Sequence, residues 1–286
     1  MSIDVNAIKN AKSISQLLEF SIINLDKPSG PTSFTVSHYI KNFLKLRKTS
    51  HLGTLDPMVS GVLPIALNRA CRLNDYLMHR DKTYVGIMRL HTEVTEEILN
   101  AAIQKFLGKI QQLPPVRSRV KRALREREVK IFKIIERDDK DILFETRVQA
   151  GTYIRKLCDD IGKEIGGAHM LELRRTNAGI FTESDSHTLY ELEKALEECN
   201  NGNEELLRAM LTPGEVIGTV LPVILVKPES IKKLYTGSPL FTQFISEDRA
   251  LEKDERVALF ANTTFIGCYR IVNEGQVRAV PEFVLN

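Results

Sequence analysis

The sequence predicts an α+β fold in which a domain built on a central mixed or antiparallel sheet is followed by a small, mostly β module. Three observations predict it. Segments with helical and with strand periodicity alternate up to Gly202, and short strand-like runs separated by turns replace them after it. The length of 286 residues is enough for one large and one small domain. We place an N-terminal extension at residues 1–20, the large domain at 21–212 and the small module at 213–286.

The large domain is expected to begin with a buried strand at 21–25, which ends in a turn rich in proline and glycine. Ser33 is expected to cap the next helix, because its hydroxyl precedes apolar residues at helical spacing. A strand at 83–90 follows, and Thr95 then caps a second helix. The apolar stripe expected on that helix is Ile98, Ala102, Ile103 and Phe106.

Further along, alternating apolar residues predict a strand at 142–150, and the pattern from 153 to 165 predicts a helix that ends at a pair of glycines. The residues that this helix should bury are Ile154, Leu157, Cys158 and Ile161. Short strands are expected in the C-terminal module at 223–226, 256–261, 265–272 and 276–280. Strands of that length, divided by turns, are typical of a small barrel or a barrel-like sheet.

The charge of the chain is concentrated in one place. Hydrophobic residues make up 43% of the sequence and charged residues 27%, and the formal net charge is only +3. The segment 117–130 alone holds seven basic and two acidic residues, so the rest of the chain is slightly negative. Such a strip is typical of a surface that meets nucleic acid, although a solvated amphipathic segment would have the same composition.

Cysteine usage and hydropathy indicate an intracellular protein. The four cysteines are scattered, without a Cys-x-x-Cys pair or a Cys/His cluster at metal-ligand spacing, so we expect free thiols. The first twenty residues lack the continuous apolar segment of a secretion signal, and no apolar run is long enough to cross a bilayer. We therefore expect a cytoplasmic location and no membrane partner.

The segment 51–64, His-Leu-Gly-Thr-Leu-Asp-Pro-Met-Val-Ser-Gly-Val-Leu-Pro, carries the strongest chemical signal. Asp56 precedes a proline, which restricts the backbone of Asp56 to extended conformations and so aims its carboxylate. An Asp-Pro turn without any function would have the same local sequence. The loop alone therefore leaves both interpretations open.

The remaining motifs resemble the TruB family of pseudouridine synthases. His-x-Gly-Thr-Leu-Asp-Pro-x-x-Ser-Gly follows Leu-Asp-Lys-Pro-x-Gly-x-Thr-Ser at 25–33, and both resemble family motifs. Lys-Thr-Tyr at 82–84, Gly-Thr-Tyr-Ile-Arg at 151–155 and Leu-Arg-Arg at 173–175 then appear in the order of the family. The segments 90–94 and 114–127 resemble the archaeal and eukaryotic dyskerin branch, which works with H/ACA guide RNAs. The C-terminal module resembles the PUA domain of that branch.

The resemblance implies isomerisation of uridine to pseudouridine in RNA, with Asp56 as the catalytic nucleophile or base. It implies that Arg155 lies near Asp56 and lowers the pKa of a buried carboxylate, and that Tyr84 stacks on uracil. Substrate contacts are expected from His51, Tyr153, Leu173 and Lys27. RNA contacts are expected from Arg117, Arg119, Lys121, Arg122 and Arg125. The reaction needs neither a cofactor nor a metal.

The resemblance further implies a role as the catalytic subunit of an H/ACA ribonucleoprotein that modifies ribosomal RNA, together with guide-free action on the T loop of transfer RNA. The implied protein partners are a zinc-ribbon protein, a β-barrel protein of the Gly/Arg family and a kink-turn binder. The chain departs from the PUA pattern at Gln243-Phe244, where the family usually has glycine before the hydrophobic residue. Two alternatives stay open: a purely stand-alone transfer-RNA enzyme, and an inactive RNA-binding scaffold.

Overall fold

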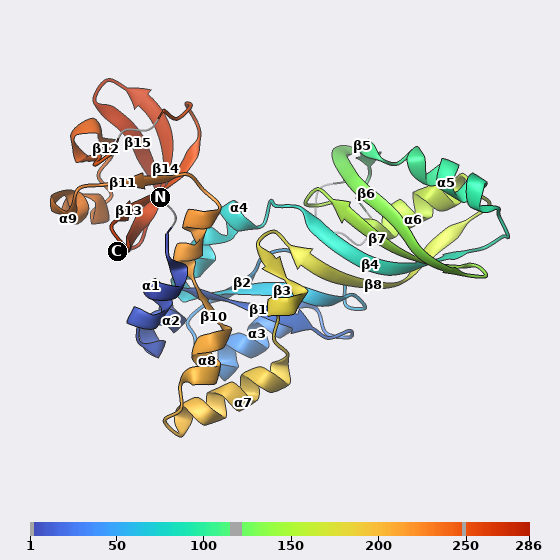
Figure 1. Ribbon diagram of the computed structural model, residues 1–286, viewed down its shortest axis with the longest axis horizontal. Coiled ribbons are helices and arrows are strands. Elements are labelled where there is room, and N and C mark those ends of the chain that lie inside the picture. The colour runs from blue at the N-terminus through green and yellow to red at the C-terminus, as the bar shows by residue number, and fades with distance from the viewer. Residues whose placement is uncertain (1–2, 115–121, 248–249) are drawn as a thin grey trace.

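A computed structural model describes residues 3–114, 122–247 and 250–286 of the chain. The two sheets that it contains lie at different places in the molecule. Figure 1 shows the C-terminal sheet at one end, with the N terminus beside it, and strands β5 to β7 at the opposite end. In this part of the chain no helix is long and apolar enough to span a membrane.

The large sheet is mixed, as expected. Its main path is β10-β1-β3-β8-β4-β7-β6-β5, and β3 pairs with β8 in parallel, whereas the other pairs are antiparallel. Two short strands, β2 and β9, pair with β3 and β8. The strands are β1 (Ser21–Lys27), β2 (Thr49–His51), β3 (Ser60–Leu67), β4 (Lys82–Leu90), β5 (Gly108–Gln112), β6 (Arg125–Asp138), β7 (Asp141–Val148), β8 (Ala168–Ala178), β9 (Phe181–Thr182) and β10 (Leu211–Pro213).

The smaller sheet is a curled array in the order β11-β13-β14-β15-β12. Its strands are β11 (Val223–Leu225), β12 (Leu240–Phe241), β13 (Arg256–Ala261), β14 (Thr264–Glu274) and β15 (Val277–Val284). The four strands expected after residue 220 are therefore present, and the structure adds the two-residue strand β12. The strand pattern fits the predicted module, while its assignment as a PUA barrel stays a prediction.

The helices are α1 (Val5–Ala11), α2 (Ile14–Glu19), α3 (Ser33–Phe43), α4 (Asn74–Leu77), α5 (Glu96–Gln104), α6 (Ile154–Lys163), α7 (Leu189–Asn200), α8 (Glu205–Met210) and α9 (Ile231–Tyr235). Helix α6 buries the four residues predicted for it, and Thr95 caps α5 as predicted. The stripe of α5 was wrong at one position, because Leu99 is buried there and Ile98 is half exposed.

Two hydrophobic cores lie on opposite faces of the large sheet. In strand β1 the side chains alternate between them, so Ile23 and Leu25 belong to the core that α3, α5, α6 and α7 cover. Ile22 belongs to the second core, together with Phe260 and Phe265 of the C-terminal sheet. Because this second core is shared, the C-terminal sheet packs against the start of the large domain, where the Phe20 ring stacks on that of Phe265. Removing it would expose apolar surface.

The N-terminal extension is attached to the end of the large domain by polar contacts. Lys9 donates to the carbonyl of Ala209 at 2.7 Å, and Arg208 donates to the carbonyls of Lys9 and Lys12. Lys12 also forms an ion pair of 2.5 Å with the buried carboxylate of Glu215. The extension thus binds the segment that leads into the C-terminal sheet. The predicted domain limits remain predictions.

Candidate active site

Asp56 lies in the loop between β2 and β3. The amide of Val59 donates to the carbonyl of Asp56 at 3.0 Å, which closes a turn around Pro57. Gly61 has a φ of +100°, and a Cβ there would come within 2.2 Å of the Arg175 carbonyl, so the loop can rejoin the sheet only through glycine. The Asp56 side chain is 52% exposed. The expected burial of this carboxylate was wrong, because the turn points it outward.

Lys27, at the end of strand β1, binds the backbone of this loop. It is fully buried, and its ammonium group donates to the carbonyls of Pro28, Pro57 and Val59 at 2.7, 3.0 and 2.9 Å. Burial lowers the pKa of Lys27, and the negative charge of Asp56 partly opposes that shift. The predicted contact of Lys27 with substrate is corrected accordingly. All three donors of the ammonium group end on protein carbonyls, so Lys27 positions the loop instead.

Ser33 holds the same loop from the side. Its hydroxyl accepts from the Leu55 amide at 2.8 Å and donates to the Leu55 carbonyl at 3.0 Å. Thr32, not Ser33, is therefore the N-cap of α3, accepting from the Thr35 amide at 3.0 Å. The sequence offered two adjacent hydroxyls for the cap, and the tertiary contact of Ser33 decides between them. Gly30 adds a further bond, from its amide to the Pro57 carbonyl.

The two arginines of the Leu-Arg-Arg motif also position the loop, a role that sequence reasoning missed. Arg175 is 1% exposed and donates to the carbonyls of Val62 at 2.7 Å and Gly53 at 3.1 Å. Arg174 makes a bidentate pair with Asp26 at 3.0 and 2.8 Å. The signal was available, because both residues stand inside a recognised motif. Of the three residues in this motif, only Leu173 was expected to contact the substrate.

Arg155 reaches Asp56 from the first turn of α6. Its guanidinium lies 2.7 Å from the Asp56 carboxylate, which confirms the predicted proximity. Gln112 fixes the start of this helix, because its side chain accepts from the Tyr153 amide at 2.9 Å and donates to the Tyr153 carbonyl at 3.2 Å. Both partners of the ion pair are more than half exposed. Such a pair contributes about 1 kcal/mol or less, so a ligand can open it at little cost.

Apolar residues of these motifs belong to one hydrophobic core. Leu55, Tyr84, Ile154 and Leu173 all belong to the same core, and the strand register places Tyr84 opposite Arg175. Strands β4 and β8, which carry Tyr84 and Leu173, are neighbours in the large sheet. Tyr84 and Leu173 are each 8% exposed. Leu173 fits its predicted place as a wall, whereas stacking of uracil on Tyr84 would use the small part of the ring that is accessible.

His51 ends β2 beside the buried arginine. Its Nδ1 atom is buried and has no hydrogen-bond partner among the described residues. Burial lowers the pKa of His51, and the charge of Arg175 lowers it further, so the imidazole is neutral near pH 7. Tyr153 is half-buried at the N-cap of α6. His51 directly precedes the loop in the chain, and Tyr153 directly precedes the helix that carries Arg155. The predicted contact of both residues with substrate stays a prediction.

The basic strip divides into parts with different roles. Arg117, Arg119 and Lys121 lie outside the described residues. Arg122 is exposed, and Arg125 is half-buried at the start of the long strand β6. Arg127 donates to the carbonyl of Gly151 at 3.1 Å and so supports the Gly-Thr-Tyr-Ile-Arg motif. Residues 125–130 of the strip belong to strand β6.

Lys82 is a second buried lysine behind the loop. It is 5% exposed and donates to the carbonyls of Met78 and Arg80. Burial, reinforced by the charge of Arg175, lowers the pKa of Lys82 to about 8 from 10.5, and Asp81 opposes the shift. This lowered pKa has a consequence for stability that can be measured.

Between pH 8 and pH 10.5 the unfolded chain binds more protons at Lys82 than the folded chain does, so stability rises with pH in this window. Below pH 8 both states are protonated and the cost of burying the charge is constant. We expect the rise to be as much as about 3 kcal/mol and to be missing in Lys82→Met. Urea unfolding at several pH values tests this. Equal pH profiles for the two proteins would contradict it, since all other titrating groups are common to both.

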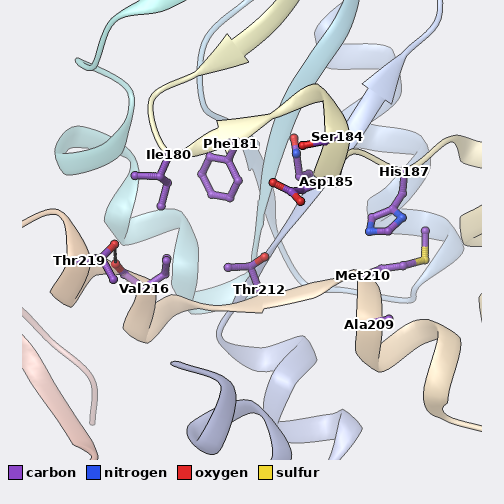
Figure 2. Close-up of a pocket in the computed structure, with 11 residues that line it drawn as sticks. Ile180, Phe181, Ser184, Asp185, His187, Ala209, Met210, Thr212, Val216 and Thr219 are labelled. Carbon is purple, nitrogen blue, oxygen red and sulfur yellow. Dashed lines mark hydrogen bonds between the residues drawn. The ribbon is translucent and has the colours of Figure 1, made fainter. Parts of the chain in front are cut away.

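A pocket of about 570 Å³ lies elsewhere in the molecule, between β10 and the turn after β9. Figure 2 shows His187 and Met210 at one end of it, Ile180 and Phe181 at the other, and Asp185 between them. None of the predicted catalytic residues lines this pocket. The pocket is therefore separate from the Asp56 loop and its pair with Arg155.

The chain is similar to known proteins over most of its length. Residues 41–154 match the family described as "TruB family pseudouridylate synthase (N terminal domain)", and residues 155–217 match "tRNA pseudouridylate synthase B C-terminal domain". A "Probable tRNA pseudouridine synthase B" of Pyrococcus abyssi is 43% identical over 248 residues, which cover 85% of this chain and 74% of that protein. The protein of the same name from Methanothermobacter thermautotrophicus is 42% identical and covers 78% of this chain and 69% of its own length.

Two solved structures extend the likeness to the C-terminal sheet. The chain in "Crystal Structure of a Cbf5-Nop10-Gar1 Complex" superposes with a TM-score of 0.89 at 36% identity, covering 96% of this chain and 88% of that one. The chain in "Structure of H/ACA RNP bound to a substrate RNA containing 2'-deoxyuridine" gives a TM-score of 0.88 at 34% identity, covering 97% and 89%.

Proposed function

Because the chain belongs to the TruB family of pseudouridine synthases, we propose that it isomerises uridine to pseudouridine in RNA as the catalytic subunit of a guide-RNA ribonucleoprotein. The family makes the protein an isomerase, so no group is gained or lost overall. The bond between the uracil nitrogen and the sugar breaks, and a carbon–carbon bond replaces it. The finer points, namely which RNA and with which partners, are the proposal.

The loop geometry supports Asp56 as the group that acts on the uridine. A uridine must leave its stack before an enzyme can reach the glycosidic bond, and Asp56 stands at the surface where such a base would arrive. The weak pair with Arg155 keeps the carboxylate oriented and opens when the nucleotide enters. Lys27, Ser33 and Arg175 hold the backbone around Asp56, which is the pre-organisation that a reactive group needs.

One observation carries the guide-dependent part of the proposal. The likeness to the chain of the Cbf5-Nop10-Gar1 complex covers nearly the whole chain, including the C-terminal sheet. A structure of an H/ACA ribonucleoprotein with substrate RNA is similar over the same extent. We therefore propose small protein partners of the Nop10 and Gar1 types. A kink-turn binder is proposed on the family resemblance alone.

A stand-alone transfer-RNA enzyme is the second candidate. The name shared by the curated relatives, tRNA pseudouridine synthase B, favours it. We propose guide-free action on the T loop as an additional activity of the guide-dependent enzyme. The two candidates then differ in whether the protein also modifies ribosomal RNA. An inactive scaffold has no need for a held loop that presents Asp56 to Arg155.

Pseudouridine mapping of total RNA, from cells with and without this protein, tests the proposal. Loss of pseudouridine at ribosomal sites together with the T-loop site is the expected result. Loss of pseudouridine at the T loop alone would contradict guided modification and support the stand-alone enzyme. If the pseudouridine map does not change, although the parent cells are shown to make the protein, the protein is an inactive RNA-binding scaffold.

The basic strip gives a further test of RNA binding. Replacing Arg119, Lys121, Arg122 and Arg125 by Ala is expected to weaken binding and to lower the slope of log affinity against log salt by about two to three units. Each phosphate contact that is lost removes roughly 0.7 to 0.9 of the slope. An unchanged slope would make the strip a solvated face. Lys194→Ala, an exposed lysine on α7, is the control for a general loss of charge.

A further inference from the structure

Three exposed side chains stand beside the Asp56 loop without a role in the site described so far. Phe34 at the start of α3 is 72% exposed, and Met58, two residues after Asp56, is 71% exposed. His38 lies one helical turn after Phe34, and the two rings stack with centroids 5.8 Å apart and planes 17° apart. Exposed apolar side chains mark an interaction site when they are grouped, and these three are grouped on segments that the Ser33–Leu55 hydrogen bonds join.

The backbone under these side chains is rigid. Ser33, next to Phe34, is bonded in both directions to Leu55, next to Asp56. Ser29 donates to the Met58 carbonyl at 3.1 Å. The backbone that carries Phe34 and Met58 is therefore held in place relative to the Asp56 loop, so that binding a ligand there costs little ordering of the protein backbone.

An unpaired nucleotide fits this surface better than a second protein does. Flat bases stack on aromatic rings whatever their sequence, and cations nearby hold the phosphates. The helix that carries Phe34 and His38 also carries Lys41, and the exposed Lys45 follows two residues after its end at Phe43. Aromatic and basic residues thus follow one another along α3, and the row begins at the catalytic loop.

We propose that Phe34, His38 and Met58 form a platform that stacks a nucleotide adjacent to the target uridine. The inference rests on the proposed function, because it assumes that a uridine is turned out at Asp56. Turning it out removes a stacking partner from its neighbour, at a cost of a few kilocalories per mole. The platform replaces that partner and so lowers the cost. It therefore acts on RNA affinity and on placement of the uridine, without touching the reacting bond.

The test uses Phe34→Ala and Met58→Ala, with Tyr190→Ala as the matched control. Tyr190 is an aromatic residue that is 76% exposed on α7. The probes are a T-arm stem-loop and a guide–target RNA pair, each with 2-aminopurine on one side or the other of the target uridine. Binding to the wild type is expected to quench 2-aminopurine at one of these positions. Phe34→Ala should lose the quench and bind about 5- to 150-fold more weakly, with an unchanged salt slope.

Phe34→Tyr should restore both quench and affinity, because the flat ring is kept. Cooperative urea unfolding of each variant excludes loss of the fold, which exposed substitutions seldom cause. Quench and affinity in Phe34→Ala equal to those of Tyr190→Ala would overturn the platform. So would a defect that appears only in binding of a protein partner. If the wild type quenches the probe but forms no pseudouridine, the proposed function fails and the platform stands.

Discussion

Asp56→Asn is expected to lower the single-turnover rate of pseudouridine formation by at least a thousandfold while RNA affinity stays within about threefold. Asparagine keeps the shape of the side chain and removes the charge that the chemistry needs. The loop should remain in place, because Lys27, Ser33 and Arg175 bind its backbone and not the carboxylate. Loss of the exposed pair with Arg155 should cost about 1 kcal/mol of stability or less.

Rate and affinity are to be measured on the same preparation, with urea unfolding as the check of the fold. Asp139→Asn is a matched control, since Asp139 is exposed and has a left-handed φ of 50° that asparagine tolerates well. A rate within about tenfold of the wild type, which is roughly 1.4 kcal/mol of barrier, would remove Asp56 from its role.

The elements that the sequence predicted well are those whose signal is local. Strands β4 and β7 alternate buried and half-buried residues, and α6 repeats its buried positions at helical spacing. Each pattern is set by the burial of one face, which the sequence records directly. The contact between Asp56 and Arg155 could be predicted only because both residues lie in motifs of one family, whose resemblance implied that they are close.

The parts that the sequence did not predict depend on contacts between distant segments. Strand β6 begins inside the basic strip and leaves Ile131 and Ile135 about half exposed, so its sequence resembles a charged surface segment. Pairing with β5 and β7 makes it a strand. A buried Lys27 is equally hidden from local reasoning. Lysine is rarely buried, and only the three carbonyls around it make its position acceptable.

The C-terminal sheet offers the test that separates the two enzymatic candidates. Deleting the module is a poor way to carry it out. Phe260, Phe265 and Phe283 share a core with Phe20, the last residue of the N-terminal extension, and with Ile22 of the large domain. Each apolar side chain uncovered in this way costs about 1.5 to 3 kcal/mol, so a truncated chain would lose activity through unfolding. Substitutions at exposed positions avoid that problem.

Helix α9 supplies such positions. Lys232 and Lys233 are exposed there, and the segment that departs from the PUA pattern at Gln243-Phe244 follows in the chain. Lys233 also lies over the Phe244 ring, with its ammonium 5.6 Å from the centroid. A guide RNA that docks on this segment would bring phosphates close to both lysines, so that reversal of their charge should repel it.

Lys232→Glu with Lys233→Glu is therefore expected to lower guided modification by at least about a hundredfold, because catalysis depends on where the guide places the target base. Modification of a T-arm stem-loop without a guide should stay within about threefold, since the Asp56 loop is untouched. Each single substitution is compared with Lys194→Glu, which reverses one exposed charge on α7. Both activities are to be assayed with the full chain. Guided activity at the wild-type level would show that this face of the C-terminal sheet does not hold the guide, and an equal loss of both activities would show that the lysines serve all RNA binding alike.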